Sequence, residues 1–441
     1  SGSFSQTVLQ GGFNLLGGIY NGITLHNANT LGNGGSIGVA GTLTNTSTLT
    51  LASTGGVTLL NLTADTTLAG TGQTVLGNRA QNIIASSSGS RVLTIAAGHT
   101  VRGGGNLGST SYGAINLVNK GTVLADAAGG MRLYTTNVDN TGGTMQVADG
   151  SFLLLSSGSL SGGTVQGAGA AYLSGSGVYR DTSLAGSLKV NNGDSLQVAG
   201  TLTNTGVFSI AGSGSVTLLN LAADTTLAGA GQTVLGDRAQ NIIASSSGSR
   251  VLTIGTGHTV RGGGNLGSTS YGAINIVNQG TVLADAATSG MSAYVGTFNN
   301  DGGTLQVAAN TRFALTGGTL SGGSLQGAAG ARIGGGGVFS NFLLTGALSV
   351  GNADTANIAG TITNDGVLSV DSTSSVTRLY LAGNTTLNGG GQTVLGASGN
   401  NHLTSTSGNA TLTIGTGHTV RGGGNLGSAS FGAINLVNQG T

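Results

Sequence analysis

The chain has 441 residues, of which 87 are glycine and only 6% are charged, and it contains no proline, cysteine, tryptophan or glutamate. The net charge of +1 argues against nucleic-acid binding, because phosphate neutralisation needs clustered lysine and arginine. The absence of cysteine excludes disulfides, thiolate metal ligands and thiol catalysis. No run of about 18 consecutive apolar residues is present, so no membrane-spanning helix is predicted.

A tandem repeat with an offset of 159–160 residues dominates the sequence. Residues 57–128 return as 216–287 with seven substitutions in 72 positions, and HTVRGGGNLGS occurs at 99, 258 and 418. Such copies favour one repetitive architecture over several separate globules. In chain order, we expect one continuous solenoid, a segment of a longer protein. Its parts are the end of a preceding repeat (1–17), two full repeats (18–176 and 177–336) and a partial third repeat (337–441).

Short strands are predicted along the whole chain. Apolar and polar residues alternate at 144–147, 187–190, 195–198 and 347–350, which is typical of strands with one buried face. Turns of the Asn-x-Gly type separate such strands, and their asparagine side chains can stack into hydrogen-bonded ladders. The turns begin at Asn119, Asn204, Asn278, Asn364 and Asn438. No amphipathic helix pattern is present.

The spacing of the strands predicts how they are wound. Glycines open successive strands at Gly121, Gly143, Gly163 and Gly186. A spacing of about 20 residues fits three short strands and three turns, which is one coil of a parallel β-helix, or β-solenoid. The fold class is therefore all-β, with about eight coils in each repeat. The second copy has one extra residue between Ala287 and Met291, which predicts an outward-facing turn there.

The best candidate ligand site is a repeated histidine–arginine pair, formed by His99 and Arg102, His258 and Arg261, and His418 and Arg421. It could be a solvated turn with a hydrogen-bonded histidine, or a row of weakly basic surface spots for anionic polysaccharide. Positions i and i+3 of a strand point to opposite faces, so one ligand could contact both residues only if a turn intervened. No catalytic residue is predicted, because glutamate is absent and no pair of aspartates persists through the copies. No cofactor site is predicted at the glycine-rich RGGGNLG segments, because no helix follows them, and no metal site is predicted, because the three histidines lie about 38 Å apart at strand spacing.

Several segments resemble a known family. NTGVFSI at 204–210, NDGVLSV at 364–370, GGTLQV at 302–307 and GGTLSGGSLQG at 317–327 are similar to repeats of the secreted filamentous haemagglutinin-like adhesins of Gram-negative bacteria. They are also similar to passenger regions of large autotransporters. The likeness is one of repeat style and covers nearly the whole chain. It implies a right-handed β-helix fibre that presents an adhesive or toxic tip.

We therefore expect a non-enzymatic, secreted protein of the bacterial cell surface. It would be the structural shaft of an adhesin or extracellular matrix fibre, acting as a long stiff rod in adhesion, biofilm formation or cell–cell contact. Expected partners are surface glycans or proteins, matrix polysaccharide, laterally associated copies of the chain and an outer-membrane secretion partner of the full protein. Neither nucleic acid nor membrane insertion is expected. The alternatives are a carbohydrate-binding or carbohydrate-cleaving β-helix, and a self-assembling extracellular filament without a receptor.

Overall fold

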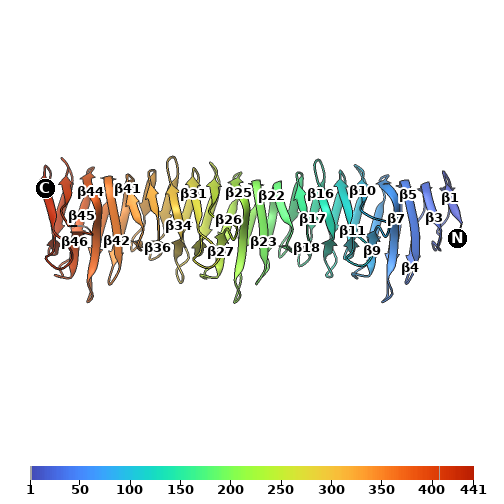
Figure 1. The fold of residues 1–441 in the computed structure, drawn as a ribbon, viewed down its shortest axis with the longest axis horizontal. Helices are drawn as coiled ribbons and strands as arrows, with labels where there is room; N and C mark the ends of the chain where they lie inside the picture. Colours follow the sequence, from blue (N-terminus) through green and yellow to red (C-terminus); the bar gives the residue numbers. More distant parts are fainter. Residues whose placement is uncertain (1, 407) are drawn as a thin grey trace. The chain divides into compact units, whose positions relative to one another are not determined.

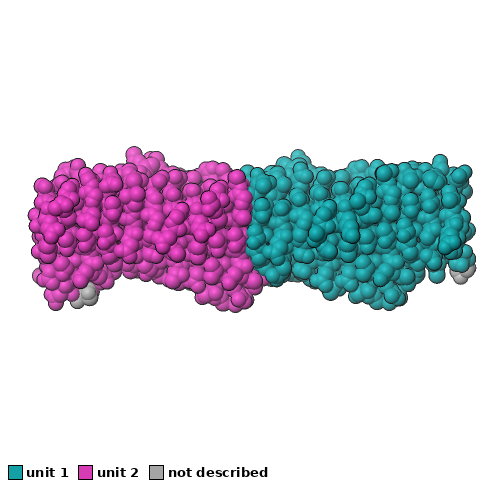
Figure 2. Space-filling view, turned by 90° about the horizontal axis from the view of Figure 1, so that it is seen from above, with its two compact units in different colours: residues 1–209 teal, residues 210–441 magenta. Residues whose placement is uncertain are grey.

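The computed structural model describes residues 2–406 and 408–441, so the first residue of the predicted 1–17 segment and one residue of the predicted 337–441 segment lie outside the described residues. Strands fill the described part of the chain, and no helix occurs in it. The chain divides into two compact units, residues 1–209 and 210–441 (Figure 2). Each is a parallel β-solenoid, and together they contain about 18 turns at a spacing of roughly 23 residues, wound as a right-handed β-helix. The predicted fold class is confirmed.

Unit 1 shows how the turns are built. One turn contains β13 (Ile115–Asn119), β14 (Thr122–Ala125) and β15 (Met131–Leu133). The next contains β16 (Thr135–Asp139), β17 (Thr144–Val147) and β18 (Phe152–Leu155) (Figure 1). Each strand pairs in parallel with the strand one turn later, β13 with β16, β14 with β17 and β15 with β18. Three short strands per turn are thus present, as predicted.

Unit 2 repeats this arrangement. Here β31 (Ile274–Asn278), β32 (Thr281–Ala284) and β33 (Met291–Ala293) pair in parallel with β34 (Val295–Asn299), β35 (Thr304–Val307) and β36 (Arg312–Leu315). The extra residue of the second copy lies between β32 and β33, outside the strands. The predicted turn insertion is confirmed.

The turns are longer than the predicted 20 residues. From Tyr20 to Tyr179, one repeat apart, the strand ladder takes seven steps rather than about eight. The prediction was based on 121–186, where the connections are short. Other connections are longer. For example, Gln73 pairs with Thr100 one turn later, whereas Thr144 pairs with Thr164 one turn later. The first of these turns therefore contains more residues than the second. Turns on the surface can lengthen in this way without disturbing the ladder.

The core is formed by alternate residues of each strand. In β14 and β17 the inward residues Val123, Ala125, Met145 and Val147 are buried, whereas their neighbours are partly exposed. Inward residues stack on their equivalents one turn away, because Val123 pairs with Met145 in the ladder. Burying such a side chain contributes roughly 1.5–3 kcal/mol. The interior can therefore be filled by small and branched apolar residues that repeat from turn to turn.

Buried asparagines connect successive turns at the ends of strands. Asn119 Nδ2 donates a hydrogen bond to Asn140 Oδ1 at 2.7 Å and to the Thr144 carbonyl at 3.2 Å, while Asn119 Oδ1 accepts from the Gly121 amide at 3.2 Å. Both asparagines are fully buried. In unit 2, Asn278 and Asn300 form the same 2.7 Å bond. The predicted asparagine ladder is present as these pairs.

Replacing Asn119 with alanine is expected to destabilise unit 1 by about 2–3 kcal/mol, because buried polar groups of Asn140, Gly121 and Thr144 lose a partner. Urea unfolding followed by circular dichroism measures this. The control is Asn137→Ala, since Asn137 is exposed and its replacement should change stability by less than about 0.5 kcal/mol. Equal effects of the two substitutions would contradict the ladder's role.

Candidate functional site

The repeated histidines lie inside the solenoid. His99, His258 and His418 are fully buried, and each Nε2 lies 3.0 Å from the hydroxyl of a threonine one turn earlier. These threonines are Thr74, Thr233 and Thr393. Burial lowers the pKa of all three histidines, and that of His258 to about 4. The histidines are therefore neutral packing residues and contribute nothing to a surface spot.

The repeated arginines lie on the outer face, as the i, i+3 spacing predicts for two residues on opposite faces. Arg102 forms an ion pair with Asp126 on the next turn, and Arg261 forms the equivalent pair with Asp285. Each of the three arginines also donates to the glutamine one turn earlier, and Arg421 does so from Nε to Gln392 Oε1 at 2.6 Å. The structure thus separates the two members of each predicted pair. Any basic spot at these positions would consist of an arginine that already has a polar partner.

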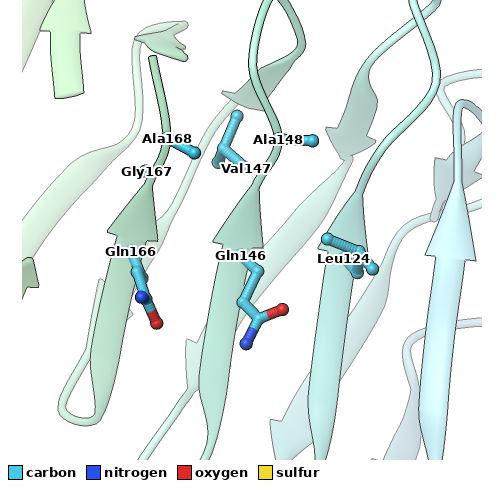
Figure 3. A pocket seen from close by; sticks show the side chains of 7 residues that line it. All are labelled: Leu124, Gln146, Val147, Ala148, Gln166, Gly167 and Ala168. Carbon is cyan, nitrogen blue, oxygen red and sulfur yellow. The ribbon is translucent and has the colours of Figure 1, made fainter. Parts of the chain in front are cut away.

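A hollow on the outer face of unit 1 lies beside Arg102, the ladder neighbour of Leu124. It has a volume of about 260 Å³ and is lined by residues of β14, β17 and β20 (Thr164–Gly167) and of the turns that follow β17 and β20. The lining residues are Leu124, Gln146, Val147, Ala148, Gln166, Gly167 and Ala168 (Figure 3). Leu124, Gln146 and Gln166 are direct ladder neighbours, so their side chains form one outward row at a spacing of about 4.8 Å.

Unit 2 has the same hollow, with a volume of about 290 Å³. It is lined by Leu283, Gln306, Val307, Ala308, Gln326, Gly327 and Ala328, which match the seven residues of unit 1 one for one. The surrounding sequence has diverged: Asp149 corresponds to Ala309, and Phe152 to Arg312. The lining is therefore retained where nearby residues are not.

The sequence predicted a strand at 144–147 but not the hollow. The hollow depends on the ladder register, which brings Gln146 beside Gln166 from the next turn. The signal that could have revealed it is the recurrence of two outward glutamines at matching positions, 146 and 166, then 306 and 326.

A second outward feature differs between the units. In unit 1, Phe152 stacks on Tyr172 with ring centroids 5.2 Å apart, and Arg132 and Lys189 lie over the two rings. In unit 2 the matching strand positions hold Arg312 and Arg332, and Arg312 forms a bidentate ion pair with Asp354 at 2.8 and 3.0 Å. Arg132 and Lys189 cover the two ring faces of the unit 1 stack. The rings therefore pack with neighbouring side chains of the surface and present no open aromatic face.

No cluster of three or more histidine, cysteine, aspartate or glutamate side chains suited to a metal ion occurs among residues 2–406 and 408–441. Nor do these residues contain a helix of the length and apolarity that a membrane crossing requires. Comparison with protein-family models and with curated proteins finds no match to the chain.

Proposed function

We propose that this chain forms part of the structural shaft of a secreted bacterial surface adhesin or extracellular matrix fibre. The observation that supports this most is that near-identical sequence blocks place the same side chains at equivalent ladder positions in both units. His99 and His258, Asn119 and Asn278, and Arg102 and Arg261 make matching contacts. A block that makes the same contacts in every copy can be added or removed without changes to the neighbouring blocks.

The physical basis of the shaft is nearest-neighbour stacking. Each strand pairs with the strands one turn before and after it, as β14 does with β11 (Thr100–Gly103) and β17. In such a stack, stability is approximately a sum of the turns and their interfaces. Added blocks therefore increase length at nearly constant stability per turn, which is the property that a long stiff rod needs.

The location and partners are part of the proposal. A cysteine-free, sparsely charged chain is compatible with export, and the repeat style resembles secreted adhesins. The partners we propose are surface or matrix glycans and proteins at the bacterial surface, and an outer-membrane secretion partner for the full protein. Lateral contacts between copies would depend little on salt, because few charges are available for screening.

The shaft proposal predicts the effect of removing one repeat. Deleting 57–215 from the full-length protein in its own bacterium joins residue 56 to Val216, which is the equivalent of Val57. Seven turns are lost, so the surface fibre should shorten by about 34 Å at about 4.8 Å per turn. Electron microscopy of the cell surface measures the length, and adhesion under flow measures the function. We expect weaker adhesion after the deletion. Adhesion should return in full when residues 57–215 are put back and the length is restored.

The matched control exchanges residues 57–128 for the sequence of 216–287, which changes seven residues and no length. It should leave both readouts unchanged. Loss of adhesion in the exchange, or unaltered fibre length after the deletion, would contradict a shaft role. Glycan cleavage by the purified chain would instead favour a carbohydrate-cleaving β-helix, and long filaments formed by it alone would favour a self-assembling filament.

A further inference from the structure

We propose that the two glutamine hollows each bind one ring of a neutral polysaccharide that lies along the outer row of the solenoid. The sites are formed by Leu124, Gln146 and Gln166 in unit 1 and by Leu283, Gln306 and Gln326 in unit 2, with their flanking turns. This inference is independent of the shaft proposal, since a shaft needs no ligand in these hollows.

The first step in the argument is the availability of the glutamine side chains in unit 1. Gln146 is half-buried and Gln166 is exposed, and neither carboxamide has a hydrogen-bond partner among the described residues. Each carboxamide offers two N–H donors and a carbonyl acceptor. In unit 2, Gln306 Nε2 donates to Gln326 Oε1 at 3.0 Å, so the two glutamine side chains can also hydrogen-bond to each other. Because unit 1 retains both glutamines without this bond, the bond does not explain why the pair recurs.

The second step is the retention of the pair. Inward residues such as Val147 and Val307 are retained because they fill the core. Outward residues on the same strands are not under this constraint: Thr164 has become Ser324, although Thr144 is kept as Thr304. Packing of the interior therefore does not account for four outward glutamines at matching ladder positions. A ligand outside the chain would account for them.

The third step is the chemistry of the lining. Two carboxamides stand beside an apolar surface made of the side chains of Leu124, Ala148 and Ala168 and the backbone of Val147 and Gly167, and none of the seven lining residues is charged. Paired hydroxyl groups match donor–acceptor carboxamides, and the C–H face of a sugar ring matches an apolar floor. An anionic ligand would leave its charge without a counter-charge in the hollow, because the nearest arginine in the row, Arg102, is paired with Asp126.

Size and direction support a polymer. Volumes of about 260 and 290 Å³ lie just below the ~300–1,000 Å³ typical of sites for drug-sized molecules, so each hollow suits one ring-sized group. The row continues on both sides of the glutamines, with Leu124 before Gln146 and Ala185 after Gln166. A chain molecule can therefore enter and leave each hollow along its row.

The test uses the purified 441-residue chain and four probes in equilibrium dialysis. The probes are the neutral hexasaccharides of β-1,4-linked glucose, α-1,4-linked glucose and β-1,4-linked mannose, with hexagalacturonate as the anionic comparison. At least one neutral probe should bind. The double variant Gln146→Ala/Gln166→Ala should lose about half of the saturable binding with the dissociation constant of the rest unchanged, because one of two equivalent hollows is removed. The quadruple variant with Gln306→Ala and Gln326→Ala should weaken binding at least about tenfold, a change of about 1.4 kcal/mol.

The matched control is Thr144→Ala/Thr164→Ala. These threonines lie on the same two strands, two residues before the glutamines, and are likewise outward and half-buried. The control should bind like the original chain, and circular dichroism should show unchanged folding in all variants. The proposal is overturned if no neutral probe binds, if the threonine control weakens binding equally, or if hexagalacturonate binds more tightly than the neutral probes. A glutamine-dependent change in sedimentation without sugar binding would assign the row to contacts between copies and would also overturn it.

Discussion

Replacing Gly103 with alanine is expected to destabilise unit 1 by about 3–5 kcal/mol, combining a left-handed backbone penalty with overpacking. Gly103 ends β11, pairs with Leu76 of β8 (Gln73–Leu76), and has a φ of +119°. A Cβ added there would overlap the carbonyl oxygen of Leu76, which is backbone and cannot move without breaking the ladder. A Cβ at Gly262 or Gly422 would likewise overlap the carbonyl oxygen of Leu235 or Leu395. Every copy of the repeat therefore needs glycine at this position.

The matched control is Gly98→Ala. Gly98 lies in the turn just before β11 and also has a positive φ, +86°, but a Cβ there meets no atom within 4 Å. Gly98→Ala should lower the free energy of unfolding only by the left-handed backbone penalty of about 1–2 kcal/mol. Hydrogen exchange of the β8 and β11 amides reads the local opening free energy in both variants. Equal losses at positions 98 and 103 would show that the close approach to Leu76 is not the cause.

Acidification from pH 7 to pH 4.5 is expected to destabilise the chain through its buried histidines. Because burial lowers the folded-state pKa below the unfolded value of about 6.5, the unfolded state binds more protons in this range. The stability is complete above about pH 6.5 and falls as the pH drops towards the folded-state pKa. For His258, whose pKa is about 4, the full loss amounts to about 3 kcal/mol, and His99, His418 and His402, whose pKa values are also lowered, add losses of the same sign.

The measurement is the urea midpoint at pH 7 and pH 4.5 for the original chain and for His99→Gln/His258→Gln/His418→Gln. The triple variant should lose most of the pH dependence, because a buried glutamine has no proton to gain and can still hydrogen-bond the threonine hydroxyl. Asp139, whose pKa is lowered by hydrogen bonds from Thr141, stays ionised in this window and does not contribute. His26 is exposed, so His26→Gln is the matched control and should leave the pH dependence intact. An unchanged acid response in the triple variant would contradict the interior position of the histidines.

The fold class was predictable from short-range sequence features. Alternation at 144–147 and the glycine that begins the next turn are enough to define a strand with one buried face, and a repeating series of such strands indicates a solenoid. The turn length was less predictable, because it depends on surface connections that carry no periodic signal. The hairpin at Ser109–Gly113, for example, lengthens one turn without altering the pairing of β13 with β10 (Arg91–Ile95).

The candidate site was predicted only in part. His99 and Arg102 recur in all copies, and sequence reasoning correctly expected opposite faces but could not say which residue faced inward. Val101 and Gly103 point inward at every second position of the strand. The same alternation places His99 inward and Arg102 outward once the strand is recognised. The hollow was beyond local reasoning, since Gln146 and Gln166 meet only through the register of two turns. Contacts between turns therefore define the outer surface, whereas patterns within a turn define the interior.

The central claim is that residues one turn apart stack directly on each other, and disulfide cross-linking tests it most directly, because the chain has no cysteine of its own. Thr122 and Thr144 are ladder partners on the outer face, and Thr164 is the partner of Thr144 one turn further. Cysteines at 122 and 144 would have Cα atoms about 4.8 Å apart, within reach of a disulfide, whereas cysteines at 122 and 164 would lie about 9.6 Å apart. Under mild oxidation, the stacking predicts rapid intramolecular cross-linking of Thr122→Cys/Thr144→Cys and none of Thr122→Cys/Thr164→Cys. Absence of the first cross-link, or formation of the second, would contradict the stacked solenoid on which the proposed functions depend.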